Sequence, residues 1–297
     1  MSVTQASLRL RIKRLVYSAR PALRPMRDAV QDVGGISNVA LTVDVEDGTN
    51  WSVADTVAFD DGEEARVTAI ATNELTITRA INGTTAAAHA QFAEIEKRPR
   101  FRIQEIDDAI ETVLHDLWPN VWVLAQGTVG TATAAKEWYT LVDADIREVL
   151  SVFYEEDDYL IPVPIVGWQF FTHLPSAEFT DTQGLFIPSF GGADIGDTLY
   201  YIARVHITAV TELLDRQESL VALGAVHNLL GGEIVARSHD PGKRTDRTVQ
   251  PGQMGRDSIW FLREYRNMRT REEIRLKEEE SRIPVNRFQQ RKRRFVP

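Results

Sequence analysis

The clearest pattern of apolar and polar positions predicts a helix at about one third of the chain. In Phe101–Trp118, apolar residues recur three or four positions apart, and acidic residues fill most of the positions between them. This spacing places the apolar side chains on one helical face and the carboxylates on the other. We predict a central core helix within residues 98–119, which ends at Pro119. Its apolar residues are Ile103, Ile106, Ile110, Val113, Leu114 and Leu117.

The segments on both sides of this helix have the composition of β-strands. From Val39 to Val45, apolar residues alternate with polar or small ones, which is typical of a half-buried strand. Ala65–Ala71 and Glu74–Arg79 are expected to form a hairpin. We predict a small β-barrel or roll in residues 37–97. Residues 120–210 are rich in aromatic residues and interrupted by prolines, and we predict a larger β-sandwich there.

Helical patterns return towards both ends of the chain. Residues 1–36 are expected to form a basic helical arm, kinked by Pro21 and Pro25, and residues 211–281 are expected to form C-terminal core helices. Residues 282–297 are too short and too basic to fold alone and are predicted to be an extended tail. The predicted fold class is therefore α+β, a helical core with two β insertions and extended basic termini.

Charge is distributed unevenly along the chain. The net charge is −9, but residues 1–27 carry seven lysines or arginines and no acid, and residues 282–297 carry six and no acid. The segment between them therefore has a net charge of −22. Basic ends on an acidic body favour binding to an acidic protein surface or to a polyanion. Because the body is acidic, we expect protein partners rather than DNA.

Composition and motifs do not indicate catalysis. The chain has no cysteine, which excludes disulfides and thiolate chemistry. None of its six histidines lies three or four positions from another, and it has no phosphate-binding glycine loop or nucleophile elbow. Asp60, Asp61, Glu63 and Glu64 are interpreted as a solvated hairpin tip. We predict no enzyme activity, no cofactor, no metal site and, because no long apolar run occurs, no membrane span.

Three stretches of the first β segment match a strand–strand–R-x-x-N-G-T-x-A-x-x-H pattern, namely Val67–Ile70, Asn73–Arg79 and Asn82–His89. This pattern resembles a module of tailed-bacteriophage virion proteins. Upstream, Trp51–Val57 is similar to the aromatic-x-Val-Gly-Asp strand start of that module, with Ala54 in place of the usual glycine. The module marks a structural protein of a phage particle.

The sequence after the module resembles the core helix of phage head-to-tail connector (adaptor, or neck) proteins. The similar segments are Arg98–Phe101, Ile106–Ile110 and Asp116–Pro119. Together with the module, the close resemblance covers residues 65–119, about a fifth of the chain. The later helices and the basic C-terminal tail agree with such proteins in the order of elements.

The resemblance implies a homo-oligomeric ring, usually of twelve copies, that lies under the portal, joins capsid to tail and lets DNA pass without specific binding. The implied partners are the portal protein, the next neck or tail-completion protein and further copies of the chain. The protein would lie in the host cytoplasm during assembly and in the virion neck afterwards. The residues expected to bind the portal or a neighbouring subunit are Arg9, Arg11, Lys13, Arg14, Arg287, Phe288, Arg291, Lys292, Arg293, Arg294 and Phe295.

Three other interpretations stay open from the sequence. The β module also occurs in other virion parts, so a tail or baseplate component is one alternative. A carbohydrate-active enzyme on the predicted β-sandwich is less favoured, because no carboxylate pair lies in an aromatic setting that would raise one pKa. A nucleic-acid-binding module that uses the basic ends is the third.

Overall fold

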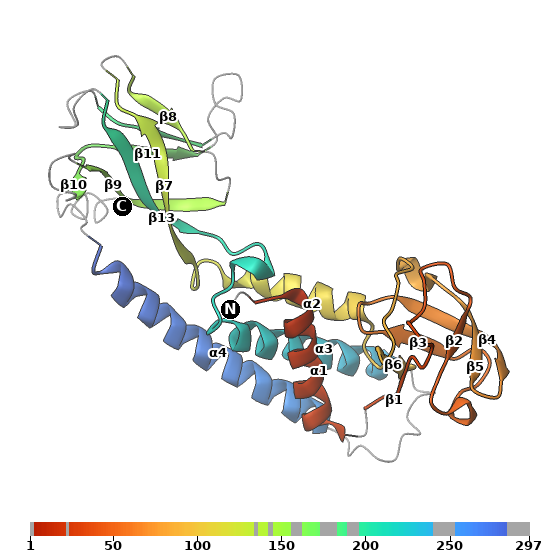
Figure 1. Cartoon of the computed structure of the whole chain (residues 1–297). Helices are drawn as coiled ribbons and strands as arrows, with labels where there is room; N and C mark the ends of the chain where they lie inside the picture. The colour runs from red at the N-terminus through yellow and green to blue at the C-terminus, as the bar shows by residue number, and fades with distance from the viewer. Residues whose placement is uncertain are drawn as a thin grey trace. The chain divides into compact units, whose positions relative to one another are not determined.

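The computed structural model describes most of the chain (Figure 1). The described residues are 3–21, 24–133, 136–141, 145–155, 162–172, 183–188, 196–239 and 253–283. They fall into two compact units, which we describe separately. The N-terminal unit spans residues 3–113 and 218–265, and the middle unit includes residues 114–217 and the part of the last helix from residue 266.

Six strands form one antiparallel sheet in the N-terminal unit. They are β1 (Met26–Ala29), β2 (Thr42–Asp44), β3 (Thr56–Phe59), β4 (Glu64–Ala71), β5 (Glu74–Thr78) and β6 (Glu94–Lys97). Their order in the sheet is β1-β6-β3-β4-β5-β2. The predicted hairpin is confirmed, since β4 pairs with β5 and places Val67 opposite Ile77. Two short 3-10 helices, η2 (Gly48–Asn50) and η3 (Ile81–Gly83), lie in the connections.

The sheet has a hydrophobic core of its own. Alternate residues of the strands point inward, as the two-residue period of a strand requires. Val43, Val57, Leu75 and Ile95, which come from four different strands, are fully buried. Phe59 is also buried and lies at the end of β3, next to the turn that leads into β4. This core fixes the base of the turn between β3 and β4.

Helices form the rest of the N-terminal unit. α1 (Gln5–Ala19) begins with a capping box at Thr4, buries Leu8, Ile12 and Val16 on one face, and contacts α3 (Glu218–His239). The predicted central helix is confirmed as α2 (Ile103–Leu117), and α4 spans Gln253–Glu280. α3 passes close to α2, because a Cβ atom on Gly224 would lie only 2.8 Å from Val113. None of the described helices is both long and apolar enough to cross a membrane.

Two antiparallel sheets with one shared core make up most of the middle unit. The strands are β7 (Val123–Thr131), β8 (Trp138–Thr140), β9 (Ile146–Glu155), β10 (Pro162–Pro164), β11 (Gln169–Thr172), β12 (Gln183–Phe186) and β13 (Thr198–Val205). One sheet has the order β10-β9-β13-β7 and the other β11-β12-β8. Tyr139 and Leu185 of the smaller sheet lie in the same buried cluster as Val149 and Leu199 of the larger one. Burial between two sheets is the basis of a sandwich.

The last turns of α4 carry a group of ion pairs within the middle unit. Glu272 accepts hydrogen bonds from Gln217 at 3.0 Å, from Arg216 at 3.2 Å and from Arg275 at 2.6 Å. Burial alone would raise the pKa of Glu272, but these hydrogen bonds outweigh it, so the pKa lies below its ordinary value of 4.5. The 3-10 helix η4 (Val210–Glu212) precedes this group.

The predicted fold class is wrong. The described residues form four α-helices and three antiparallel sheets, so the fold is mixed and β-rich rather than a helical core with β insertions and extended termini. Two features explain the difference. Each β segment buries a core of its own. The segment after Pro25, which the sequence assigns to a basic helical arm, forms β1 at the edge of the six-stranded sheet. The helix before it, α1, buries its apolar face and is not an extended arm.

Candidate functional site

Acidic residues fill the turn between β3 and β4. Gly62 adopts φ +110°, a conformation that glycine reaches without the strain of a side chain. The backbone N–H of Glu63 donates to Asp61 Oδ1 at 3.0 Å, which closes the turn. Asp60 and Asp61 are exposed, as a solvated hairpin tip requires. The same interpretation is wrong for Glu63 and Glu64, which are only 2% and 3% exposed.

Glu63 is the centre of a buried ion network. The guanidinium of Arg79 donates from Nε to Glu63 Oε1 at 2.7 Å, and its Nη2 donates to the other carboxylate oxygen. The backbone N–H of Ala87 and Nε2 of His89 each lie 2.9 Å from Glu63 Oε2. Burial alone would raise the pKa of Glu63, but hydrogen bonds from Arg79, Ala87 and His89 outweigh it and lower the pKa. Glu63 is therefore held as a carboxylate.

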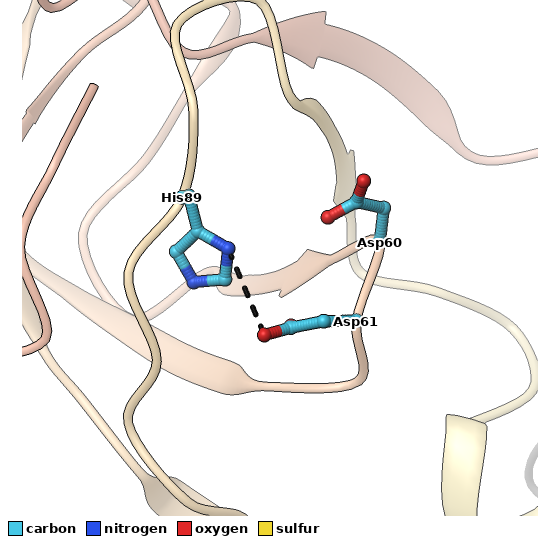
Figure 2. A group of neighbouring side chains, drawn as sticks. All are labelled: Asp60, Asp61 and His89. Carbon is cyan, nitrogen blue, oxygen red and sulfur yellow. Dashed lines mark ion pairs between the residues drawn. The ribbon is translucent and has the colours of Figure 1, made fainter. Parts of the chain in front are cut away.

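His89 connects this network to the turn. Its ring stacks on Phe59, with centroids 3.9 Å apart and an angle of 6° between the planes. Its backbone exchanges two hydrogen bonds with Ile36, which fixes the segment that carries it. Because Nε2 faces Glu63, Nδ1 faces the other way, towards Asp61, whose Oδ2 lies 3.8 Å away. Figure 2 shows both carboxylates of the turn, Asp60 and Asp61, on the side of the ring that carries Nδ1.

The remaining polar residues of the R-x-x-N-G-T-x-A-x-x-H motif bind the neighbouring acid, Glu64. Asn82 Nδ2 donates to Glu64 Oε2 at 2.6 Å, and the backbone N–H of Glu64 donates to Thr84 Oγ1 at 3.1 Å. Asn82 and Gly83 have φ values of +55° and +81°, which the Asn-Gly pair tolerates well. The polar side chains of the motif thus form hydrogen bonds with Glu63 and Glu64 and fix the start of β4.

Ala54 takes the conformation for which the module usually has glycine. Its φ is +73°, in the left-handed region, and its N–H donates to Val67 O at 2.8 Å. An alanine there costs roughly 1–2 kcal/mol relative to the right-handed region. The left-handed conformation is thus present at this position even though the glycine is not.

The predicted partner-binding residues at the N-terminus lie on α1, and three of the four pair within the chain. Arg14 is exposed and forms no ion pair with the residues that the structure describes. The pairs of the others are Arg9 with Asp107 at 2.5 Å, Arg11 with Glu218 at 3.2 Å and Lys13 with Glu96 at 2.9 Å. These three cations thus contribute to packing within the N-terminal unit. The predicted C-terminal residues Arg287, Phe288, Arg291, Lys292, Arg293, Arg294 and Phe295 lie outside the described residues.

A cleft of about 290 Å³ lies between α1 and strands β3 and β6 of the same unit. Its wall contains cations from α1 and carboxylates from the sheet, so its charges are largely compensated. The lining residues include Arg9, Lys13, Phe59, Asp60, Glu94 and Glu96. The cleft therefore presents Asp60 to solvent beside the turn but does not offer a site of one charge.

Comparisons with known proteins add no identification: no protein-family model matches the chain, and a search of curated proteins gives no significant match.

Sequence reasoning did not find the buried role of Glu63. A signal was present in the motif itself, because a buried arginine and a buried histidine in one β module require a carboxylate near both. Apart from Glu74 in the same hairpin, the acids of the β3–β4 turn lie about as far along the chain from Arg79 as Glu94 and Glu96 do, so sequence distance does not single out Glu63. The alternation of apolar and polar residues along β5 does not show which of these acids is buried.

Proposed function

We propose that the chain is a structural protein of a tailed-bacteriophage virion, a head-to-tail adaptor that binds the portal and joins capsid to tail. One observation carries the proposal. The motif that resembles the phage module is used as a unit, because Arg79, Asn82, Thr84 and His89 all bind the adjacent acids Glu63 and Glu64. A match by chance in composition would not require these side chains to converge. The helix that resembles the adaptor core follows this sheet directly as α2.

The distribution of charge suits an assembly role. The acidic body, with a net charge of −22 over residues 28–281, repels DNA phosphates and so favours passage over binding. The basic tail has six cations and no acid, so it is attracted to acidic surfaces of a portal or of a neighbouring copy. Phe288 and Phe295 lie among these cations and supply apolar anchors of the kind that dominate binding energy at interfaces.

The N-terminal cations contribute to this role unequally. Arg11 is already neutralised by Glu218 at 3.2 Å, whereas Arg14 is exposed on the same helix. A cation that has a carboxylate within its own chain must give it up to bind a partner, and this reduces the gain. We therefore assign partner binding at the N-terminus mainly to Arg14 and assign the larger share to the tail.

Binding to purified portal rings of the same phage tests the proposal. The full-length chain is compared with a tail-neutralised variant in which Arg287, Arg291, Lys292, Arg293 and Arg294 are replaced by glutamine. Sedimentation and negative-stain microscopy are expected to show rings of the chain on the portal, and the variant should bind at least about tenfold more weakly. Salt above about 0.1 M should weaken the wild-type complex, because it screens exposed charges.

A pair of single variants on α1 provides the control. Arg14→Gln should weaken portal binding more than Arg11→Gln, since Arg11 already pairs with Glu218, whereas Arg14 pairs with no carboxylate in the described part of the chain. No binding of the chain to portal rings at low salt would overturn the proposal, and binding to DNA instead would favour the nucleic-acid alternative. Assembly onto a tail tube or baseplate, without portal binding, would assign the chain to another part of the virion.

A further inference from the structure

We propose that Asp60, Asp61 and His89 form a binding site for one Zn²⁺ ion at the β3–β4 turn of the N-terminal unit. The three ligand atoms, two carboxylate oxygens and Nδ1 of the imidazole, all lie within 4.8 Å of one another. Zinc takes imidazole and carboxylate ligands at about 2.0–2.2 Å in tetrahedral geometry, which places ligand atoms about 3.4 Å apart. Figure 2 shows the two carboxylates on the Nδ1 side of the ring.

The buried histidine is the observation that distinguishes this group from an ordinary acidic turn. His89 is 4% exposed, and Nδ1 has no hydrogen-bond partner among the described residues, since the nearest carboxylate oxygen, Asp61 Oδ2, is 3.8 Å away. Glu63 already accepts hydrogen bonds from Arg79 and Ala87. A carboxylate can only accept, so its contact with His89 is a hydrogen bond donated by the N–H at Nε2. Nδ1 is therefore the ring nitrogen that faces the two aspartates of the turn.

This arrangement orients the ring as metal sites do. A histidine that binds a metal commonly donates its other ring N–H to a carboxylate, which fixes the tautomer and raises the basicity of the ligand. Glu63 has this relation to His89 at 2.9 Å, and stacking on Phe59 fixes the plane of the ring. Nδ1 faces two carboxylates, a setting that favours a cation between them. The ion would supply that cation.

The three ligand atoms would have to move only slightly closer together to bind zinc. Asp60 and Asp61 are exposed, so their side chains can rotate by the ångström or so that separates 3.8–4.8 Å from the spacing of zinc ligands. Asp61 keeps Oδ1 on the backbone N–H of Glu63, which leaves Oδ2 for the ion. One nitrogen and two carboxylate oxygens favour zinc over calcium or magnesium, which prefer oxygen ligands alone. Water would complete the fourth position.

Zinc titration of the full-length, tag-free chain, stripped with EDTA, tests the site. Isothermal titration with ZnCl₂ should give one ion per chain, and MgCl₂ at the same concentration should give none. Asp60→Asn and Asp61→Asn should each weaken zinc binding at least about tenfold; both positions are exposed, so these variants are expected to fold. Glu74→Gln, which removes an exposed carboxylate of the same sheet, should leave the affinity unchanged within about twofold.

Hydrogen exchange of the turn gives an independent measurement. Zinc should slow the exchange of amides in residues 60–63 and 87–90 in the wild-type chain and in Glu74→Gln, but not in Asp61→Asn. A chain that binds no zinc would overturn the proposal. Zinc binding that is equally strong in both aspartate variants would also overturn it, because the ion would then lie elsewhere.

Discussion

Replacing Glu63 by leucine would leave the guanidinium of Arg79 buried without its carboxylate, and we expect this change to destabilise the six-stranded sheet by about 3–5 kcal/mol. The side chains of Glu63 and Arg79 are 0% and 5% exposed, so water cannot replace the lost partner. Arg79→Met should cost a similar amount, because it leaves the carboxylate of Glu63 buried. The double variant removes both charges, but it leaves the N–H groups of Ala87 and His89 without an acceptor and the carbonyls of Ser37 and Ala87 without the donor that Arg79 supplies. Each lost partner costs roughly 1–3 kcal/mol. Because no unpaired charge stays buried, the double variant should cost less than the sum of the two single variants.

Hydrogen exchange measured by mass spectrometry reports this difference for the sheet alone. Every 1.4 kcal/mol corresponds to about a tenfold change in an equilibrium constant, so amides of β3 and β4 should exchange about a hundredfold to a few thousandfold faster in each single variant. Glu74→Gln, which is an exposed change in the same sheet, should stay within about 0.5 kcal/mol of wild type. Costs that simply add in the double variant, or a less than tenfold effect of Glu63→Leu, would refute the reasoning.

Three further substitutions test helix packing and electrostatics. A Cβ on Gly224 would lie 2.8 Å from Val113, so Gly224→Ala should destabilise the chain by about 1–3 kcal/mol. On the same helix Gly231 has no contact closer than 3.6 Å, so Gly231→Ala should stabilise it by about 0.5–1 kcal/mol; thermal unfolding that shifts equally in both variants would contradict the packing. Because the pKa of Glu272 is lowered from 4.5, its stabilisation is present above about pH 4.5 and is lost as the pH falls through the folded-state pKa. Glu272→Gln should flatten the loss of stability between about pH 5 and pH 3, and an unchanged acid limb would argue against this pairing.

Local patterns were sufficient to predict the elements that bury one face of a regular repeat. α2 has apolar residues at helical spacing from Ile103 to Leu117, and every one of them is buried. The β4–β5 hairpin has two β-rich runs joined by a short connection, and its strands pair as expected. In both cases the signal lies within about eighteen consecutive residues, so distant partners were not needed to read it.

The fold class was missed because its deciding contacts are distant along the chain. β1 has only four residues, Met26–Ala29, and its partner β6 begins at Glu94. A four-residue edge strand directly after prolines has too few positions to show alternation. The basic composition of the first 27 residues favoured a solvated arm, whereas α1 buries one face and pairs three of its cations within the unit. Composition therefore predicts that this segment is positively charged, but not which carboxylates its cations pair with.

The start of β4 shows why the candidate site itself could not be read from alternation. A strand with one buried face would expose either Glu63 or Glu64, yet both are buried. Each has its own set of partners from the segment after β5, with Arg79 and His89 on Glu63 and Asn82 and Thr84 on Glu64. Two parts of one motif thus bind two adjacent acids at a single turn. The same convergence orients the His89 ring so that Nδ1 faces the exposed aspartates. A residue pattern that serves the fold thus also determines which ring nitrogen is left for a ligand.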